Sequence, residues 1–380
     1  MKKNILLKIR IKQLKTLVLL KLLSFFALFI KKHHWVICER GTDARDNGWH
    51  FYQYMKKSHP EIKIYYVIDT KSADYEKVKV DAIQYGSIKN YWIVVTAKRI
   101  VSSHIATCVP HLYGRPWKYS RLGKKFYFLQ HGVIKDDLIG LHKETAQMKL
   151  FICGAKPEYE YIKDTYGHGE DVVQYTGLAR YDNLHDIKTK KQILIMPTWR
   201  KFIYTKEDFL TSKYFQEWNG LLKNKKLIEI LQKGGYELIF YPHYEVQKYL
   251  NYFNNEGNDY IKIASFKDYD VQTLLKESTL LITDFSSVFF DFGYMKKPII
   301  YFQFDADLFF DKHYKKGYFD YKEHGFGNVC LVVEEVVEEI EKYLLNDCAM
   351  EDIYLERLKG FFPLHDTNNC QRIYEKIIEK

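Results

Sequence analysis

The chain has 380 residues, a length that suits two domains of about 100 to 200 residues each. Apolar residues make up 47% and charged residues 28% of the sequence, as in globular proteins, which excludes a disordered, collagen-like or polytopic membrane protein. The formal charge is +10, but residues 1–38 hold nine of the 58 Lys and Arg and no Asp or Glu. Residues 39–380 therefore carry 49 bases against 48 acids, which argues against a nucleic-acid partner.

The first 34 residues are predicted to form a basic segment that associates with a membrane. Their apolar stretch at 17–30 has 14 residues and includes Lys21, whereas a helix needs about 20 apolar residues to cross a bilayer core. No small-residue cleavage site follows, which argues against a cleaved signal peptide. We expect an amphipathic helix on an anionic membrane surface, peripheral to the cytoplasmic face of the cell membrane. A marginal transmembrane anchor and a helix packed on the protein itself are the alternatives.

The cysteines give no sign of a metal or disulfide site. They are scattered along the chain without the C-x-x-C spacing that brings two thiolates to one centre. We expect reduced, mostly buried side chains and a cytosolic compartment. The six are Cys38, Cys108, Cys153, Cys330, Cys348 and Cys370.

From residue 35 onward, short β-rich apolar runs alternate with helical patterns. In the first half, strands are expected at 35–39, 63–68, 99–102, 126–130, 149–153 and 172–175, with helices at 46–57 and 157–166. A polar stretch at 182–191 follows, and the alternation then restarts. The second half is expected to contain strands at 192–196, 236–241, 279–283, 298–302 and 329–333 and helices at 215–233, 245–253, 288–295, 334–345 and 369–380.

This alternation predicts an α/β fold whose parallel sheets are covered by helices on both faces. We place the domain boundary in the polar stretch, which gives a basic membrane-associating segment at 1–34 and two Rossmann-like, doubly wound domains at 35–185 and 186–380. The last helix is expected in the second domain or crossing back onto the first. Two such domains facing a central cleft would bring the carboxyl ends of both sheets to one ligand site.

The most informative segment for chemistry follows the third strand of the second half. That strand ends at Thr283, Asp284 comes next, and Ser286 and Ser287 open a helix whose first backbone amides lack intrahelical partners. Two hydroxyls beside such amides suit a phosphate, and Asp291 lies one turn further along the same helical face. Simple helix capping by Ser and Asp is the alternative.

Two other strand ends of the second domain carry basic residues. The strand at 192–196 leads to Thr198 and Arg200, and a guanidinium there can grip a phosphate in a forked geometry. The strand at 236–241 ends at Pro242 and His243. A structural loop histidine is the alternative for His243, but three polar strand ends in one domain favour a common phosphate site.

In the first domain, His131 follows an apolar strand directly, and Gly132 permits a tight turn beside it. Histidine side chains titrate near neutral pH, so one at this place can take a proton from a substrate hydroxyl or, when protonated, hold phosphate charge. A structural histidine is the alternative.

Two further groups of charged residues have simple structural interpretations. Arg180 and Asp182 lie near the domain boundary, where a surface ion pair is expected. An acidic cluster follows the first strand and suits either acceptor hydroxyls or helix capping. It consists of Glu39, Asp43, Asp46 and Asn47.

Several common catalytic patterns are absent from the sequence. No Walker A, GxGxxG, GxSxG, HExxH or EF-hand pattern occurs, which argues against P-loop ATPases, dehydrogenases, serine hydrolases and zincins. No clustered carboxylates show metal-ligand spacing. We therefore predict no metal site and no tightly bound cofactor, while loosely held Mg²⁺ on a diphosphate substrate stays open.

Taken together and in order, these motifs resemble the CDP-glycerol glycerophosphotransferase family, the teichoic acid polymerases and primases. The resemblance runs from residue 35 to the end, and the PTWR and TDFSSVFFDF runs are its most specific parts. Six motifs carry it: His131-Gly132 with Lys135; Gly177 with Arg180 and Asp182; PTWR at 197–200; Pro242-His243; Thr283-Asp284 with Ser286, Ser287 and Asp291; and KPIIYF at 297–302.

The resemblance implies a two-lobed GT-B type fold with an N-terminal acceptor domain and a C-terminal CDP-polyol donor domain. It implies transfer of glycerol phosphate from CDP-glycerol to a hydroxyl of a lipid-linked or polymeric acceptor, with release of CMP. His131 and His243 are the catalytic candidates. The implied substrate-binding residues are Gly132, Val133, Ile134, Lys135, Arg180, Pro197, Thr198, Arg200, Pro242, Asp284, Ser286, Ser287 and Asp291.

The mechanistic hypothesis is an in-line displacement with His131 as general base. The second domain would neutralise the diphosphate and hold the polyol through Arg200, His243, Ser286, Ser287 and Asp291. Val133 and Ile134 stand where the family motif has Thr and Pro, so a CDP-ribitol donor and a capsular product stay open. Two other functions also stay open: a GT-B glycosyltransferase that uses a nucleotide sugar, and a catalytically inactive protein that binds a membrane polymer.

Overall fold

The structure, a computed structural model, describes residues 2–30, 33–255 and 257–380. They form two compact units. Unit 1 contains the described residues of Met1–Val133, Leu138–Asn183 and Asp366–Lys380. Unit 2 contains Ile134–Asp137 and the described residues of Leu184–His365.

Unit 1 is built on a seven-stranded sheet in which every neighbouring pair is parallel. The strand order is β3-β2-β1-β4-β5-β7-β8. The strands are β1 (Trp35–Cys38), β2 (Ile64–Ile68), β3 (Ala82–Gln84), β4 (Arg99–Ser102), β5 (Phe126–Phe128), β7 (Leu150–Cys153) and β8 (Val173–Tyr175). Every residue of β1, β4, β5 and β7 is buried, because helices cover both faces of such a sheet, and their sequences are therefore mostly apolar runs.

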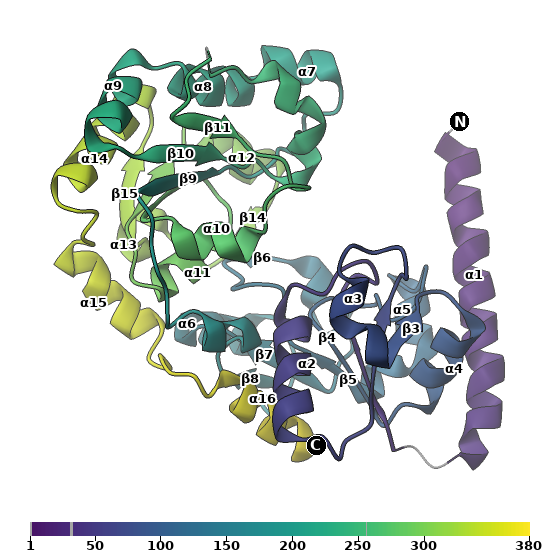
Figure 1. The fold of residues 1–380 in the computed structure, drawn as a ribbon. Helices are drawn as coiled ribbons and strands as arrows, with labels where there is room; N and C mark the ends of the chain where they lie inside the picture. Colours follow the sequence, from purple (N-terminus) through teal and green to yellow (C-terminus); the bar gives the residue numbers. More distant parts are fainter. Residues whose placement is uncertain (1, 31–32, 256) are drawn as a thin grey trace. The chain divides into compact units, whose positions relative to one another are not determined.

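The helices of unit 1 include the last helix of the chain, α16. They are α1 (Lys2–Phe26), η1 (Ala27–Phe29), α2 (Asn47–Ser58), α3 (Tyr75–Val78), η2 (Lys79–Asp81), α4 (Ile88–Thr96), α5 (Arg115–Ser120), η3 (Leu122–Lys125), η4 (Ile139–Leu141), α6 (Lys156–Thr165), η5 (Ala179–Asn183) and α16 (Asn369–Ile378). The last of these, α16, lies beside α2 and η5 (Figure 1). The carboxylate of Asp182 accepts hydrogen bonds from the backbone N–H groups of Asn369 (2.8 Å) and Cys370 (2.9 Å), so Asp182 caps the start of α16 rather than forming the expected surface pair with Arg180.

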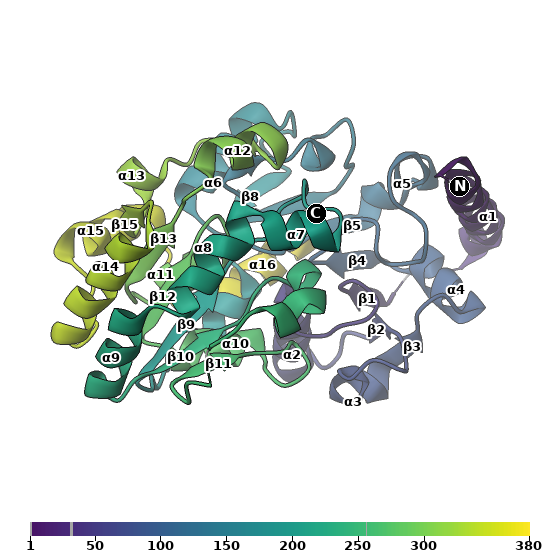
Figure 2. The same ribbon diagram turned by 90° about the horizontal axis from the view of Figure 1, so that it is seen from above.

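The first helix, α1, packs along α4 and α5 and is seen almost end-on beside them in Figure 2. Its inward face buries Thr16 and Leu20, and the Thr16 hydroxyl donates to the carbonyl of Pro110 at 3.1 Å. The outward face is a stripe of exposed apolar side chains spaced three or four residues apart, which we call the apolar stripe. It consists of Leu7, Ile11, Leu14, Val18, Leu22 and Phe25.

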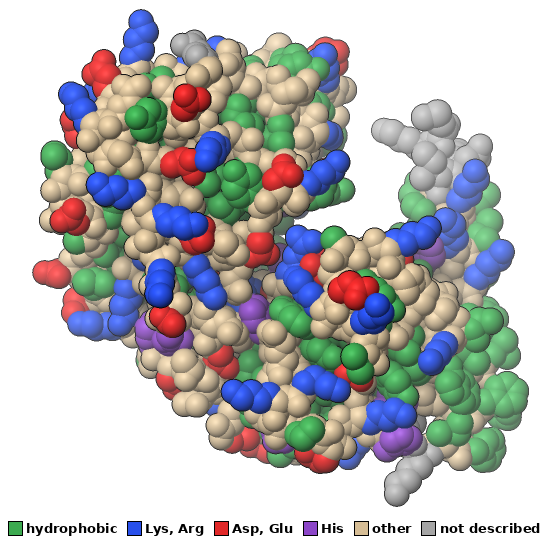
Figure 3. Space-filling model, in the orientation of Figure 1, with side chains coloured by type: hydrophobic (Ala, Val, Ile, Leu, Met, Phe, Trp, Pro, Cys, Tyr) green, Lys and Arg blue, Asp and Glu red, His purple; other side chains and the backbone are tan. Residues whose placement is uncertain are grey.

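Figure 3 shows how charge is distributed along α1. Blue basic side chains gather along its upper, N-terminal half, and green apolar side chains gather along its lower half. Among the described residues, no helix combines the length and the hydrophobicity that crossing a bilayer requires.

Unit 2 has a six-stranded parallel sheet with the order β11-β10-β9-β12-β13-β15. Its strands are β9 (Gln192–Met196), β10 (Glu237–Phe240), β11 (Ile261–Ile263), β12 (Leu280–Thr283), β13 (Ile299–Phe302) and β15 (Gly327–Cys330). A separate antiparallel pair joins β6 (Asp136–Asp137) to β14 (Lys315–Lys316). In both parallel sheets the strand order reverses direction beside the first strand, at β1/β4 in unit 1 and at β9/β12 in unit 2, and this switch point is where open α/β sheets bind ligands.

The helices of unit 2 surround this sheet. They are α7 (Lys206–Thr211), α8 (Lys213–Leu222), α9 (Lys225–Gly234), η6 (Tyr244–Tyr252), α10 (Val271–Glu277), α11 (Val288–Tyr294), α12 (Ala306–Lys312), α13 (Tyr321–His324), α14 (Val333–Leu345) and α15 (Asp352–Phe361). The predicted single helix at 215–233 is wrong, because Asn224 interrupts it and its side chain accepts a hydrogen bond from the N–H of Leu227 at 3.0 Å, which starts α9. The predicted strand at 329–333 is displaced, since the strand ends at Cys330 and α14 begins at Val333.

The predicted α/β class with two parallel sheets is confirmed. The six cysteines are free and buried, as predicted. Sequence reasoning missed β3 and β11, which have three residues each and lie at sheet edges. Edge strands are only partly covered, so they lack the continuous apolar run that marked the central strands.

Candidate active site

The switch point of unit 1 gathers polar side chains from four separate loops. Asp46 follows β1, His104 follows β4, His131 follows β5 and Arg180 follows β8. These strands all run parallel, so their carboxyl ends lie at one edge of the sheet. The fold therefore brings together four side chains that are far apart in the sequence.

Asp46 is the centre of this group. Its Oδ2 atom contacts the Nδ1 atom of His131, and its Oδ1 atom accepts a hydrogen bond from Arg180 Nη1 at 2.8 Å. Burial alone would raise the pKa of Asp46, but its contact with His131 and the charge of Arg180 hold that pKa well below its usual range. Asp46 is thus a carboxylate at neutral pH, with a cation on one oxygen and an imidazole on the other.

Asn47 is fully buried beside Asp46. Its side chain links the loops that carry His131 and Arg180 by contacting their backbones. Its side-chain amide donates to the carbonyl of Gln130 at 2.8 Å and accepts from the N–H of Arg180 at 3.0 Å. Gln130 has a positive φ of 64°, a strained conformation for a residue with a side chain. This turn directly precedes His131, so Asn47 stabilises the backbone that positions the histidine.

His104 lies beside His131, with their ring centroids 4.8 Å apart. Its Nε2 accepts a hydrogen bond from Arg40 Nε at 3.1 Å, which is possible only when that nitrogen carries no proton. Burial, and next the neighbouring His131, lowers the pKa of His104 to about 3. His104 is therefore neutral near pH 7.

Glu39 stabilises the turn between β1 and α2 through hydrogen bonds to its backbone. Its carboxylate accepts hydrogen bonds from the backbone N–H groups of Arg45 (3.0 Å), Asp46 (3.0 Å) and Trp49 (2.8 Å). The acidic cluster after the first strand therefore serves two purposes: Glu39 caps the turn, as one interpretation of the sequence expected, and Asp46 contacts His131.

One group of described residues has the spacing of metal ligands: Asp46, His104 and His131, whose ligand atoms lie within 4.8 Å of one another. Two guanidinium groups would repel a cation at this place, because Arg180 binds Asp46 and Arg40 donates to His104. Their positive charge, together with the hydrogen bond that uses the His104 lone pair, favours a hydrogen-bonded network over a metal centre at this place.

The switch point of unit 2 contains a buried ion-pair network. Arg200 donates to both carboxylate oxygens of Asp305 at 2.8 Å and to Asp284 Oδ2 at 2.9 Å. Asp284 Oδ1 also accepts from the N–H of Thr198 at 2.8 Å. The side chains of Arg200 and Asp284 have no exposed surface. These two residues tie together the loops after β9, β12 and β13, and their predicted contact with a phosphate stays a prediction.

Thr198 lies on the loop after β9, and His243 lies on the loop after β10. The N–H of Glu245 donates to His243 Nδ1 at 3.2 Å, so the proton of the neutral ring lies on Nε2. The His243 ring is exposed and stacks on Trp199 with centroids 5.9 Å apart. The Thr198 hydroxyl is buried without a hydrogen-bond partner among the described residues, an arrangement that suits a group able to bind a polar ligand.

The serine motif forms the start of α11 as predicted. Ser286 and Ser287 are half-buried, and Ser287, although it is the N-cap residue, accepts no capping hydrogen bond from the described backbone. Asp291, one turn later, is buried within α11. The helix-capping alternative for Ser287 is therefore not the arrangement found.

The remaining predicted site residues lie in less accessible places. Lys135 is buried and its Nζ pairs with Asp136 Oδ2 in unit 2, while the side chains of Val133 and Ile134 are buried apolar contacts. The part of these three residues in substrate binding stays a prediction. Pro197 and Pro242 are also buried, whereas Gly132 is half-exposed beside His131.

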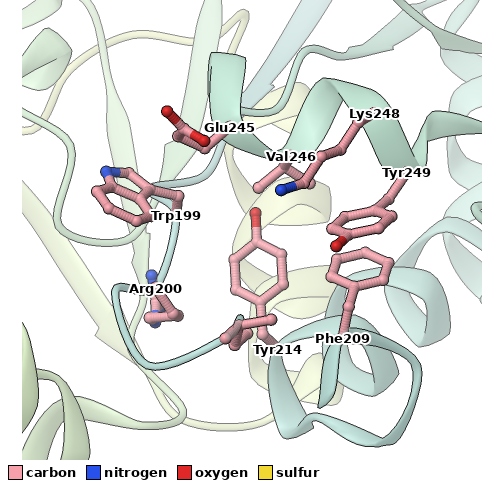
Figure 4. A pocket seen from close by; sticks show the side chains of 9 residues that line it. Trp199, Arg200, Phe209, Tyr214, Glu245, Val246, Lys248 and Tyr249 are labelled. Atoms are coloured by element: carbon pink, nitrogen blue, oxygen red, sulfur yellow. The ribbon is translucent and has the colours of Figure 1, made fainter. Parts of the chain in front are cut away.

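A small pocket of about 40 Å³ lies next to the β9 loop (Figure 4). Tyr214 points its hydroxyl toward Val246 and Lys248, and Trp199 and Glu245 form the opposite side. The Tyr214 hydroxyl is buried and has no hydrogen-bond partner among the residues described. The pocket thus adjoins His243, which both Trp199 and Glu245 contact.

Sequence reasoning missed His104 and Asp305, and it left Asp46 and Asn47 undecided between capping and ligand contact. His104 follows an apolar strand in the same way as His131, so the strand-end rule that selected His131 would also have selected it. The sequence carries no comparable signal for Asp305, which is 105 residues from Arg200.

Comparison with known protein families gives a match over most of the chain. Residues 20–379 match the family described as CDP-Glycerol:Poly(glycerophosphate) glycerophosphotransferase. The chain is 35% identical to the minor teichoic acid biosynthesis protein GgaB of Bacillus subtilis (strain 168), over 93% of this chain and 40% of that protein. It is 26% identical to the teichoic acid poly(glycerol phosphate) polymerase of the same organism, over 77% of this chain and 41% of that protein. The chain thus spans about two fifths of the length of these relatives.

A solved structure of the wall teichoic acid polymerase TagF shares the fold. It aligns with a TM-score of 0.70 at 20% identity and covers 98% of both chains. At this identity the likeness establishes the arrangement of the chain and not its activity.

Proposed function

The chain belongs to the CDP-glycerol:poly(glycerophosphate) glycerophosphotransferase family, and from this we propose that it transfers glycerol phosphate, or a related polyol phosphate, from a CDP-polyol to a hydroxyl of an acceptor. In this reaction the acceptor oxygen attacks the phosphorus that bears the polyol. A new O–P bond forms, the P–O bond of the diphosphate breaks, and CMP leaves. The acceptor would be a lipid-linked or polymeric polyol phosphate of teichoic acid or capsule.

The observation that carries the proposal is that each sheet places an exposed histidine after a parallel strand at its carboxyl edge. His131 follows β5 in unit 1, and His243 follows β10 in unit 2. Structures of the similar polymerase TagF include a histidine variant soaked with CDPG, which fits a role for histidine in this chemistry.

The two histidines are suited to different tasks. His131 Nδ1 contacts a carboxylate, which leaves Nε2 as the nitrogen with the lone pair, so we assign this ring the proton of the attacking hydroxyl. The Nε2–H of His243 can donate to a phosphate oxygen of the donor. The hydroxyls of Thr198, Ser286 and Ser287 would add donors to the diphosphate.

Arg200 supports this site without contacting the donor. Phosphoryl transfer depends mostly on positioning and charge neutralisation, and the Arg200 network holds the loops that carry Thr198 and the serines. Mg²⁺ bound loosely to the diphosphate would supply further neutralisation.

We also propose that α1 holds the enzyme at an anionic membrane surface, on the cytoplasmic face of the cell membrane. The apolar stripe is exposed, and basic side chains flank it along the same helix: Lys8, Arg10, Lys12, Lys15 and Lys21. Apolar side chains beside Lys and Arg suit the boundary between acyl chains and anionic headgroups. Packing of the opposite face on α4 and α5 keeps the stripe pointing outward.

A donor panel tests the proposed reaction. The purified chain is incubated with acceptor lipid or polymer and, separately, CDP-glycerol, CDP-ribitol and several nucleotide sugars, and the released nucleotide is measured. CMP release from a CDP-polyol, together with growth of the acceptor, supports the proposal. Nucleotide release only from a sugar donor would favour a glycosyltransferase. Acceptor binding without turnover of any donor would favour an inactive polymer-binding protein.

A further inference from the structure

The contact between Asp46 and His131 carries an inference about how the base works, and it rests on the proposed function of His131. We propose that Asp46 is the positioning residue of His131: it holds the ring with Nδ1–H on the carboxylate, so that Nε2 is the atom that receives the acceptor proton. Asp46 itself touches neither substrate in this proposal.

The tautomer follows from the partners. A carboxylate can only accept hydrogen bonds, so the nitrogen that contacts Asp46 Oδ2 must carry the proton. A neutral imidazole has a single N–H, and the lone pair therefore lies on Nε2. The ring belongs to a side chain that is 59% exposed, whereas the Asp46 side chain is only 14% exposed. The buried carboxylate of Asp46 thus fixes the orientation of the His131 ring, whose Nε2 atom is the accessible base.

Arg180 keeps this pair in place from the other side. Its Nη1 atom donates to Asp46 Oδ1 at 2.8 Å and to the backbone carbonyl of His131 at 2.6 Å. One guanidinium therefore fixes both the carboxylate and the loop that carries the ring. The same charge lowers the proton affinity of Asp46, so a proton that reaches His131 stays on the imidazole.

The neutral ring of His104 lies beside His131 and adds no charge to its surroundings. His104 is the nearest ring and is neutral, with its lone pair used by Arg40. When the acceptor O–H bond breaks and its proton joins Nε2, the new positive charge is compensated by the Asp46 carboxylate. The proton then leaves to solvent after CMP departs, and Asp46 stays ionised throughout.

Three variants test the proposal. Asp46→Asn keeps the size of the side chain but can donate to Nδ1, which allows the opposite tautomer, and Asp46→Glu keeps the charge. Asp69→Asn is the matched control, because Asp69 lies in the loop after the neighbouring strand β2 and contacts Lys71 and Gln84 instead of the histidine. The readouts are kcat for CMP release, the Kd of CDP-glycerol, and the ¹⁵N NMR signals of labelled His131.

We expect Asp46→Asn to lower kcat by about 10² to 10⁴ with the Kd within about threefold of wild type, Asp46→Glu to recover part of the loss, and Asp69→Asn to match wild type. The wild-type NMR signals should show Nδ1–H. A kcat within threefold of wild type in Asp46→Asn, a parallel loss of donor affinity, or an Nε2–H ring in the wild type would overturn the proposal. If the wild type turns over no CDP-polyol, the proposed function fails, while the NMR signals still decide the pairing of Asp46 with His131.

Discussion

The guanidinium of Arg180 lies 2.8 Å from the carboxylate of Asp46, although 134 residues separate them in the chain. Both side chains are nearly buried, at 11% and 14% exposure. Removing one partner of such a pair leaves a poorly solvated charge, which costs up to about 3 to 5 kcal/mol when burial is complete. The pair is therefore important for stability as well as for the orientation of His131.

Replacing Arg180 by Ala should impair both properties. We expect a loss of stability of about 2 to 3 kcal/mol, measured by urea denaturation, and a fall in kcat for CMP release of at least about tenfold because the His131 loop loses its anchor. Arg180→Lys keeps the charge and should recover part of each loss. Wild-type kcat in Arg180→Ala would show that the His131 loop holds its position without the guanidinium.

Arg200 should behave as a buried structural residue. Arg200→Met leaves Asp284 and Asp305 without their cation, and we expect a loss of about 3 to 5 kcal/mol in the free energy of unfolding. The exposed pair between Lys190 and Glu277 in the same unit is the control, and Lys190→Met should change stability by less than about 1 kcal/mol. Equal losses in the two variants would contradict the assignment of Arg200 to the buried network.

The apolar stripe of α1 should determine membrane binding. We expect the triple variant L14D/V18D/L22D to lose at least about tenfold in affinity for vesicles that contain anionic lipid, because it places charge in the face that enters the acyl boundary. Flotation of the protein with vesicles measures this. The control is V80D/L345D, which changes two exposed apolar residues on other helices, and retained binding in the triple variant would refute the role of the stripe.

His313 should make the protein sensitive to acid. Burial, and next the charge of Lys201, lowers the pKa of His313 to about 3, whereas an unfolded histidine titrates near 6.5. Between these values the unfolded chain binds more protons than the native one. His313 therefore does not lower the free energy of unfolding above pH 6.5. As the pH drops from 6.5 toward 3, the free energy of unfolding falls by at most about 1.4 kcal/mol per pH unit.

The variant His313→Asn isolates this effect. Its side-chain oxygen can replace Nδ1 as the acceptor for the N–H of Lys201, but it does not titrate. We expect His313→Asn to lose less stability than wild type between pH 7 and pH 5 in urea denaturation, even if it is less stable at pH 7. The same pH dependence in both proteins would assign the acid sensitivity to other groups.

The central strands and the polar residues that follow them could be predicted from the sequence for a simple physical reason. A parallel strand covered on both faces needs an almost unbroken apolar run, and such runs mark β1 and β9 clearly. The residues that follow strand ends, such as His131 and His243, could be named as candidates because parallel strands bring their carboxyl ends to one edge.

Tertiary structure alone decided what these candidates contact. The PTWR run indicates a guanidinium near a phosphate site, but only the folded unit shows that Asp284 and Asp305, 84 and 105 residues away, neutralise Arg200 completely. In the same way, the sequence indicates that Asp46 caps α2, and its Oδ1 atom does accept from the N–H of Asn47 at 2.7 Å, but only the fold shows its contact with His131, which spans 85 residues. Local sequence determined the central strands, because propensity and burial act over a few residues, whereas the short edge strands β3 and β11 carry too weak a pattern. The partners of each charge depend on which strand ends lie side by side, and this is a property of the sheet order.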